Sequence, residues 1–257
     1  MPPRIHRIPF ADNLLRRLAE DVVAHLPGAE SGDLTDALVL LPSSRACRTL
    51  QHEMLEVSGR DTLLLPRIST VGGWAEEMAA TLGLTAADLP DDRLRSVILA
   101  RRLMTLPWLK DNPDSASGLA TEFIGFFDEV RLNRRDDLIL DPRNAGRVLE
   151  KSSAAEAEII EGDLSRIHEV WSHYRGLVAM DSVDRLVDLA GVLSAAGVPG
   201  PACALVVAAG FGRVDPVRAE LLQAALGHAG EGRLYLPEAE DVFSLMFQAT
   251  WSPDAPG

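Results

Sequence analysis

Lysine is almost absent from this sequence, and its scarcity excludes two kinds of catalytic site. Of the 25 basic residues, only Lys110 and Lys151 are lysines, and the other 23 are arginines. The phosphate-binding P-loop of an NTPase needs a lysine directly after a glycine, whereas leucine precedes Lys110 and glutamate precedes Lys151. Restriction-type nucleases pair an acid with a lysine two positions later, but Trp108 and Leu149 occupy those positions. The chain therefore has neither site in its standard form.

Cysteines and long apolar segments are also scarce. Cys47 and Cys203 are too few for a zinc or iron–sulfur site and lack the CxxC spacing, so we expect free thiols in a reducing cytosol, with no metal and no cofactor. Apolar runs such as Ala202–Ala209 are far shorter than the roughly 20 residues of a membrane span. The first ten residues contain arginines but no apolar core of a signal peptide. These absences predict a cytoplasmic protein without a membrane partner.

The charge balance is acidic, with 25 basic against 38 acidic residues and a net charge of −13 over 257 residues. A protein that binds DNA by itself is usually basic. The balance therefore argues against a free-standing DNA binder. It remains compatible with one domain of a larger assembly whose basic surface lies elsewhere.

Short apolar runs alternate with amphipathic segments over the first ninety residues, which is typical of an α/β domain. Each run is short enough for a buried strand, and each amphipathic segment follows a residue that commonly caps a helix. The expected strands are Arg4–Ile8, Ala37–Leu41 and Thr62–Leu65, and the expected helices begin at Asp12 or Asn13, at Ser43 or Ser44, and at Ser69 or Thr70. This order predicts a parallel sheet.

The pattern changes to helical periodicity alone between about residues 90 and 197. The expected helices there are Asp92–Leu106, Ser115–Leu132, Ala154–Met180 and Val183–Ala196. A strand at Ala204–Ala208, a helix starting at Asp215-Pro216 and a strand at Leu234–Leu236 then follow. We predict an α/β core formed by residues 1–89 and 198–241, interrupted by an all-helical insertion at 90–197, with an irregular or truncated tail at 242–257.

Two loops that follow expected strands are candidate anion sites. Ser43, Ser44 and Arg45 lie where a central strand meets a helix N-terminus, and backbone N–H groups with the helix dipole can hold a phosphate there. The segment from Arg67 to Thr70 occupies the equivalent place after the next expected strand. The alternative for both loops is a plain helix cap, which serine and threonine supply routinely.

Other motifs in the sequence favour structural roles. The fragment Gly210-Phe211-Gly212 lacks the third glycine of a dinucleotide loop, so a tight turn is the simpler interpretation. The arginine clusters of the helical segment are interpreted as solvated helix faces, with a nucleic-acid patch as the alternative; they are Arg101, Arg102, Arg131, Arg134 and Arg135. Aromatic residues at helical spacing are expected in the core; they are Trp74, Phe123, Phe126, Phe127 and Trp171.

The order of these segments resembles the N-terminal region of the AddB-type subunit of bacterial AddAB helicase–nucleases, in its alphaproteobacterial form. The likeness spans residues 4 to about 238. The stretches that carry it are Arg7-Ile8-Pro9-Phe10, Leu40–Arg45, Leu64–Ile68, Ala208–Phe211 and Leu234–Pro237. The resemblance implies a RecA-like, P-loop-NTPase-like core with a helical insertion, as in superfamily 1 helicases.

The same resemblance locates two departures from an active ATPase. Where active relatives have a glycine-rich P-loop after the first strand, this chain has Pro9 to Asn13, including Asp12, without glycine or lysine. Where they have an acid that holds Mg²⁺, this chain has Ala209, which cannot coordinate a metal. We therefore expect an inactivated nucleotide site and no catalytic residue in this chain.

The resemblance also implies partners and a function. Ser43, Ser44, Arg45, Arg67 and Thr70 become candidate contacts to the phosphates of single-stranded DNA, bound without reading its sequence. The chain is expected to scaffold DNA and an AddA-type helicase–nuclease subunit in recombinational repair of double-strand breaks, without an enzymatic activity of its own. Two alternatives remain open: an α/β enzyme or small-molecule binder that uses the loops near Ser43 and Gly210, and a truncated gene product without independent function.

Overall fold

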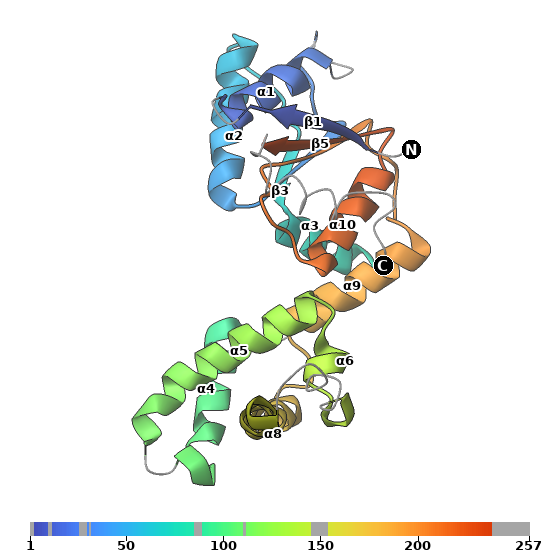
Figure 1. Ribbon diagram of the computed structural model, residues 1–257. Coiled ribbons are helices and arrows are strands. Elements are labelled where there is room, and N and C mark those ends of the chain that lie inside the picture. The colour runs from blue at the N-terminus through green and yellow to red at the C-terminus, as the bar shows by residue number, and fades with distance from the viewer. Residues whose placement is uncertain are drawn as a thin grey trace. The chain divides into compact units, whose positions relative to one another are not determined.

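The computed structural model describes residues 3–9, 12–25, 30, 32–84, 89–109, 112–144 and 154–237 (Figure 1). The chain divides into two compact units. One, the sheet unit, comprises residues 1–84 together with 189–257, and the other, the helical unit, comprises residues 85–188. The expected tail at 242–257 lies outside the described residues.

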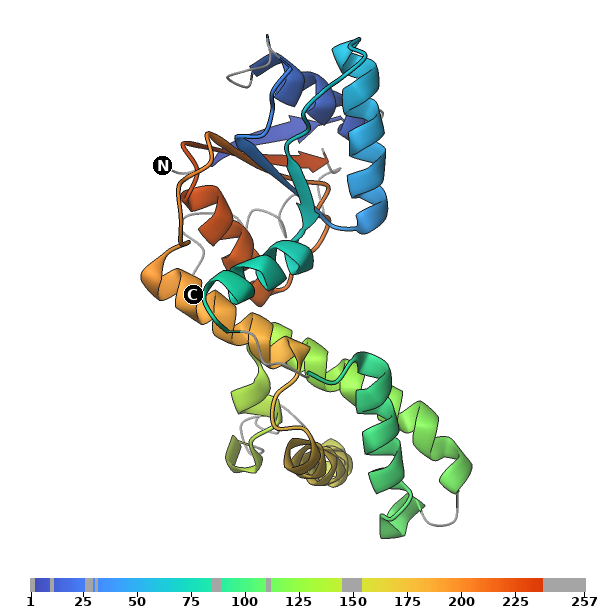
Figure 2. The same cartoon turned by 180° about the vertical axis from the view of Figure 1, so that it is seen from behind.

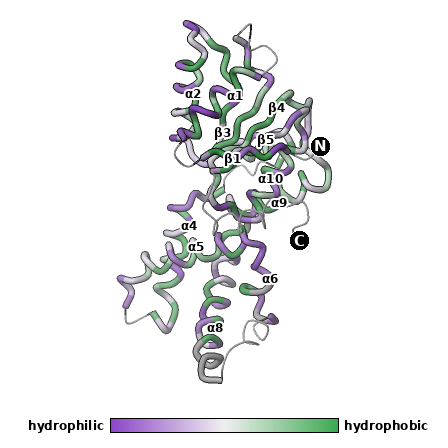
Figure 3. The backbone as a smooth tube through the Cα atoms, turned by 45° about the horizontal axis from the view of Figure 1, so that its top comes forward, coloured by the Kyte–Doolittle hydropathy of each residue, from purple (hydrophilic) through white to green (hydrophobic). Residues whose placement is uncertain are grey.

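Five parallel strands form the sheet of the first unit. They are β1 (Arg4–Ile8), β2 (Ala37–Leu41), β3 (Arg67–Thr70), β4 (Leu205–Ala209) and β5 (Glu231–Pro237), in the spatial order β1-β5-β4-β2-β3. Every residue of β2 and β4 is buried, because these central strands are covered on both faces. Figure 3 shows the apolar character of the central strands. The predicted α/β class with a parallel sheet is confirmed, and this sheet is compatible with a RecA-like core.

Helices cover both faces of the sheet (Figures 1 and 2). Helices α1 (Leu14–His25) and α2 (Ser44–Ser58) pack together on one face, above alternate residues of the central strands such as Val39 and Val207. Helices α3 (Val71–Thr81) and α10 (Pro216–Gly227) pack together against the strands from the other side. The result is a three-layer α/β arrangement, whose ligand sites normally lie at the carboxyl ends of the strands.

The predicted helix starts in the sheet unit are confirmed. The hydroxyl of Ser43 accepts a hydrogen bond from the backbone N–H of Ala46, and Asp215 caps α10 with Pro216 at its first position. Helix α2 ends at Gly59, whose φ of 60° is the left-handed conformation that glycine adopts without strain. Local sequence signals therefore fix where these helices begin and end.

The predicted strand at Thr62–Leu65 is wrong. Leu64 forms only an isolated β-bridge with Asp33, and Leu64 itself is 60% exposed. The strand β3 begins at Arg67. Pro66 has no N–H to donate to a sheet, so regular pairing starts after it. The segment from Arg67 to Thr70 is therefore a strand rather than a loop.

The helical unit contains α4 (Asp92–Leu103), α5 (Ala116–Leu132), α6 (Asp136–Ile139) and α8 (Ala154–Leu177), with short 3₁₀ turns at Pro107–Leu109, Pro113–Ser115 and Pro142–Asn144. Helix α9 (Ser182–Ala196) begins in this unit and continues past residue 188, so its second half belongs to the sheet unit. The predicted boundary at residue 197 therefore differs from the observed division. Asp181 caps α9 by accepting from the backbone N–H groups of Val183 and Asp184.

Aromatic packing forms the centre of the helical unit. Phe127 of α5 is fully buried, and its ring lies 4.9 Å from that of Trp171 and 5.9 Å from that of Tyr174 on α8. Phe123 and Phe126 flank it on the same helix. The predicted core role of these aromatic residues is confirmed, and Trp74 is likewise buried in the sheet unit.

Candidate functional site

The carboxyl edge of the sheet gathers the loops that follow β1, β2, β3 and β4. Leu41 at the end of β2 pairs with Thr70 at the end of β3, and Leu40 pairs with Ala208 near the end of β4. Ser43 and Ser44 follow Leu41 directly after Pro42, so the candidate residues around Ser43 and Thr70 share this edge. Parallel pairing alone brings them together, although they are distant in sequence.

The hydroxyls of Ser43 and Thr70 serve as helix caps. Ser43 Oγ accepts from Ala46 N at 3.2 Å, and Thr70 Oγ1 accepts from Gly73 N at 3.0 Å. The capping role that the sequence left open is therefore present at both loops. Each hydroxyl still has a proton to donate, since capping uses only the oxygen as an acceptor.

Three exposed arginines lie in the segments that follow β2 and β4. Arg45 lies in the first turn of α2, Arg48 lies one turn further on, and Arg213 follows the turn after β4. None of the three has an ion-pair partner among the described residues. The sequence analysis named Arg45 but missed Arg48, three residues later on α2, and Arg213, which directly follows Gly212.

Arg67 lies away from the other candidate contacts. It pairs with Leu38 at the start of β2, three residues before the carboxyl end, which is roughly 10 Å along a strand. Its guanidinium forms an ion pair with Glu77 of α3. The sequence grouped Arg67 with this edge because the strand was predicted five residues too early.

The described residues that follow β1, namely Pro9, Asp12 and Asn13, lead into α1. The carbonyl of Pro9 accepts from the backbone N–H of Asp12 at 2.9 Å, and Asn13 then caps α1. The carboxylate of Asp12 lies 3.3 Å from the guanidinium of Arg17 on the same helix. Asp12 and Arg17 are both exposed, so this pair contributes little to stability.

Ala209 is fully buried at the end of β4, among the apolar residues that pack against α1 and α2. The next residue, Gly210, has a φ of 78°, which turns the chain away from the sheet. A methyl group added at Gly210 would lie 3.5 Å from Leu14 Cδ2 and 3.6 Å from Pro42 Cδ. Apolar side chains therefore adjoin the carboxyl end of β4.

A buried network of charges lies in the helical unit. Arg95 of α4 donates to both carboxylate oxygens of Asp128, at 3.0 and 2.5 Å, and to the hydroxyl of Tyr174 at 2.7 Å. Arg131 of α5 donates to both oxygens of Asp181, at 3.0 and 2.8 Å. The hydroxyl of Tyr174 completes the network by donating to Asp181 at 2.6 Å.

The prediction that Arg131 lies on a solvated helix face is wrong. Arg131 is only 5% exposed, because Asp181 supplies the counter-charge that allows its guanidinium to be buried. Arg134 and Arg135 are exposed, as expected. Arg102 is partly buried and approaches the ring of His173 at 3.1 Å.

The network makes the stability of the protein sensitive to acid. Burial alone would raise the pKa of Asp181, but hydrogen bonds from Arg131 and Tyr174 outweigh it and lower that pKa to about 2. The ordinary pKa is 3.8, so protonation at acidic pH favours the unfolded chain. We expect about 2 kcal/mol of unfolding free energy from Asp181 above pH 4, lost as the pH falls from 4 to 2.

Urea unfolding at pH 6 and at pH 2.5 checks this expectation. Other carboxylates titrate in the same range, so the informative quantity is the difference between the natural chain and Asp181→Asn, which has no proton to gain. The loss of stability between the two pH values should be smaller in the variant. An equal loss in both proteins would contradict the assignment to Asp181.

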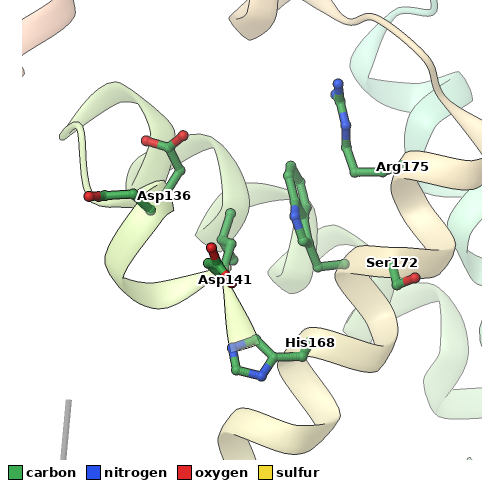
Figure 4. Close-up of a pocket in the computed structure, with 8 residues that line it drawn as sticks. Asp136, Asp141, His168, Ser172 and Arg175 are labelled. Atoms are coloured by element: carbon green, nitrogen blue, oxygen red, sulfur yellow. The ribbon is translucent and has the colours of Figure 1, made fainter. Parts of the chain in front are cut away.

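A surface pocket of about 510 Å³ lies between α6 and α8 in the helical unit (Figure 4). Its polar side chains are largely paired within the protein. His168 Nε2 lies 2.9 Å from the carbonyl of Ile139, Asp141 binds Arg143, and Arg175 binds Asp184 at 2.6 Å. Ser172 also lines the pocket, but no hydrogen bond joins its hydroxyl to His168 or to another base among the described residues, so the pocket shows no activated nucleophile.

Other possible sites are limited. Cys47 and Cys203 are free thiols, and burial raises the pKa of each. Across the described ranges, no group of three or more His, Cys, Asp or Glu side chains is arranged to hold a metal ion. Within the same ranges, no helix combines the length and the apolar character needed to cross a membrane.

Comparisons with known proteins add no assignment. No protein-family model matches the sequence, and a search of curated proteins also finds no significant match. The class of protein is therefore defined by its fold, an α/β protein with a five-stranded parallel sheet and a separate helical unit. Its candidate site is the carboxyl edge of that sheet.

Proposed function

We propose that this chain is the helicase-like domain of an AddB-type subunit, with an inactivated nucleotide site. In this proposal it guides single-stranded DNA and holds an AddA-type motor subunit during double-strand break repair in the cytoplasm. The observation that carries the proposal is the composition of one sheet edge. That edge has two capped helix N-termini, with exposed arginines in the segments after β2 and β4, and in this proposal Pro9 and Ala209 take the positions of the two nucleotide motifs.

The arrangement suits contacts to DNA phosphates. Arg45 and Arg48 offer positive charge in the first turns of α2, where backbone N–H groups and the helix dipole favour an anion, and Arg213 adds an exposed charge in the segment after β4. Contacts of this kind position a strand without reading its bases. The Ser43 and Thr70 hydroxyls support the same interaction through their free protons, whereas Arg67 lies too far from the edge to take part directly.

The alternative function, a small-molecule binder near Ser43 and Gly210, has less support. Leu14 and Pro42 occupy the space beside Gly210. The third interpretation, a truncated product, depends on the residues after Pro237, which lie outside the described part of the chain. The DNA-scaffold proposal is therefore the one that the edge residues favour.

Binding of single-stranded DNA across a salt series tests the proposal. The double variant Arg45→Glu/Arg213→Glu should bind about tenfold more weakly at low salt. The plot of log affinity against log salt should also become shallower, with a slope smaller in magnitude by about 1.4, because two phosphate contacts are lost. Fluorescence anisotropy with a labelled oligonucleotide measures both quantities, for the chain alone and with the AddA-type subunit.

A matched control separates a local contact from net charge. Arg143→Glu/Arg166→Glu makes the same charge change at two exposed positions in the helical unit and should alter neither affinity nor slope. The DNA-scaffold role is rejected if the natural chain shows no salt-dependent binding in either form, or if both variants behave alike. ATP with Mg²⁺ should not raise the melting temperature, since binding to the folded state would stabilise it.

A further inference from the structure

The solvent-facing side of α4 in the helical unit has an unusual composition. Leu94, Val97 and Met104 are 50, 51 and 46% exposed, and Arg93 and Arg101 are exposed beside them. With 100° per residue, these five positions fall within an arc of about 100° on one side of the helix. We name this set of five residues the α4 face.

The opposite side of the helix explains why the α4 face is left uncovered. Arg95, Leu99 and Leu103 are buried, and α4 packs on α5 and α8 through that side (Figure 1). Among the described residues, the contacts of α4 thus use the buried side and leave the α4 face exposed. Three large apolar side chains on one side of a helix are more than scattered surface hydrophobics, and such patches commonly mark interaction sites.

The arginines indicate the charge of the partner. Arg93 and Arg101 have no ion-pair partner among the described residues, in contrast to Arg95 on the same helix, which is fully neutralised inside the unit. A partner that covers the leucine, valine and methionine must therefore also face two unpaired positive charges. Carboxylates at the margin of an apolar stripe provide that complement.

We propose that the α4 face docks an acidic amphipathic helix of another protein. The 12 residues of α4 span roughly 18 Å, which matches about three turns of a partner helix. A symmetric contact between two copies of this chain is disfavoured, because it would bring the arginines of both copies into one interface. DNA is also disfavoured, because phosphates do not cover exposed leucine and methionine. The inference does not depend on the proposed DNA role.

Two synthetic peptides test the proposal directly. Both are amphipathic peptides of about 18 residues, which is long enough for helix formation, and both have leucines on one side. The acidic peptide has glutamates beside the leucines, and the basic peptide has lysines at the same positions. The acidic peptide should bind the full chain at least about tenfold more tightly than the basic peptide in calorimetric titration. Val97→Asp should weaken that binding about tenfold, because it places a polar, negatively charged group in the α4 face, where it repels the acidic peptide.

Charge reversal provides the decisive comparison. Arg93→Glu/Arg101→Glu should exchange the preference, so that the basic peptide binds more tightly than the acidic one. Leu64→Asp, at an exposed leucine of the sheet unit, should leave both affinities unchanged. Unchanged circular dichroism shows that each variant is folded, as expected for exposed positions.

Three results would overturn the proposal. The first is absent binding of the acidic peptide, the second is equal binding of the two peptides, and the third is a preference that persists after charge reversal. Sedimentation velocity tests whether a second copy of the chain occupies the α4 face instead. If the natural chain is a dimer and Val97→Asp is a monomer, the α4 face is assigned to a second copy.

Discussion

Asp181→Asn is expected to lower the free energy of unfolding of the helical unit by about 3 kcal/mol at pH 7. The substitution keeps the size of the side chain but removes the negative charge that faces Arg131 and Arg95 inside the protein. Losing one partner of a buried ion pair leaves an uncompensated charge, which typically costs 3–5 kcal/mol. Asp128 and Asp184 still contact Arg131, so we expect the lower end of that range.

Urea unfolding followed by circular dichroism measures this loss, and Asp163→Asn is its matched control. Asp163 makes an exposed ion pair with Arg166 on α8, so the same substitution there should change stability by less than about 1 kcal/mol. Similar losses of unfolding free energy in the two variants would show that the buried ion pair of Asp181 stabilises the protein no more than an exposed one. A stable Asp181→Asn protein would contradict the expected role of the network.

Ala209→Asp is expected to destabilise the sheet unit by about 3 kcal/mol or more. Under the proposed function, the change inserts the acid of an active nucleotide site, yet the position is fully buried among apolar residues of α1, α2 and the central strands. An unpaired carboxylate there must either lose its hydration or take up a proton, and both cost free energy. We also expect that Mg²⁺ does not restore the lost stability, because one carboxylate is too few ligands for the ion.

Chemical unfolding with and without millimolar Mg²⁺ measures both parts of this expectation. Ala202→Asp is the control, since it makes the same change at an exposed residue shortly before β4 and should be nearly neutral. Strong stabilisation of Ala209→Asp by Mg²⁺ would mean that a latent metal site survives at the edge. That outcome would contradict the inactivated site in the proposed function.

Much of the sheet unit was predictable because its signals are local. Ala37–Leu41 is apolar throughout, as a strand buried on both faces must be, and Ser43 and Asp215 cap helices through hydrogen bonds to residues three positions later. The strand at residues 62–65 was predicted wrongly, because apolar composition alone does not show which part of a segment pairs. The proline at position 66 decides that point by limiting where the ladder can start.

The candidate edge was predictable only in part. Ser43 and Thr70 were identified from helix starts, but Arg213 required knowledge that β4 lies beside β2, which is a long-range pairing. The same limit explains Arg131: an arginine is normally placed at the surface unless its partner is known. Its partner Asp181 lies fifty residues further along the chain, so no local pattern could identify the pair.

The pairing of β1 with β5 imposes an order on folding during synthesis. Within the described part of the chain β1 pairs only with β5, so Arg4 must wait for Arg233 to leave the ribosome before it gains its neighbour. At about 5–20 residues per second, that wait is roughly 10 to 50 seconds. The helical unit is contiguous in sequence and can form earlier. Until β5 has been synthesised, however, the edge of β4 that will pair with β5 stays open and can pair with a wrong strand. Chaperone demand should therefore be highest just before the last strand emerges.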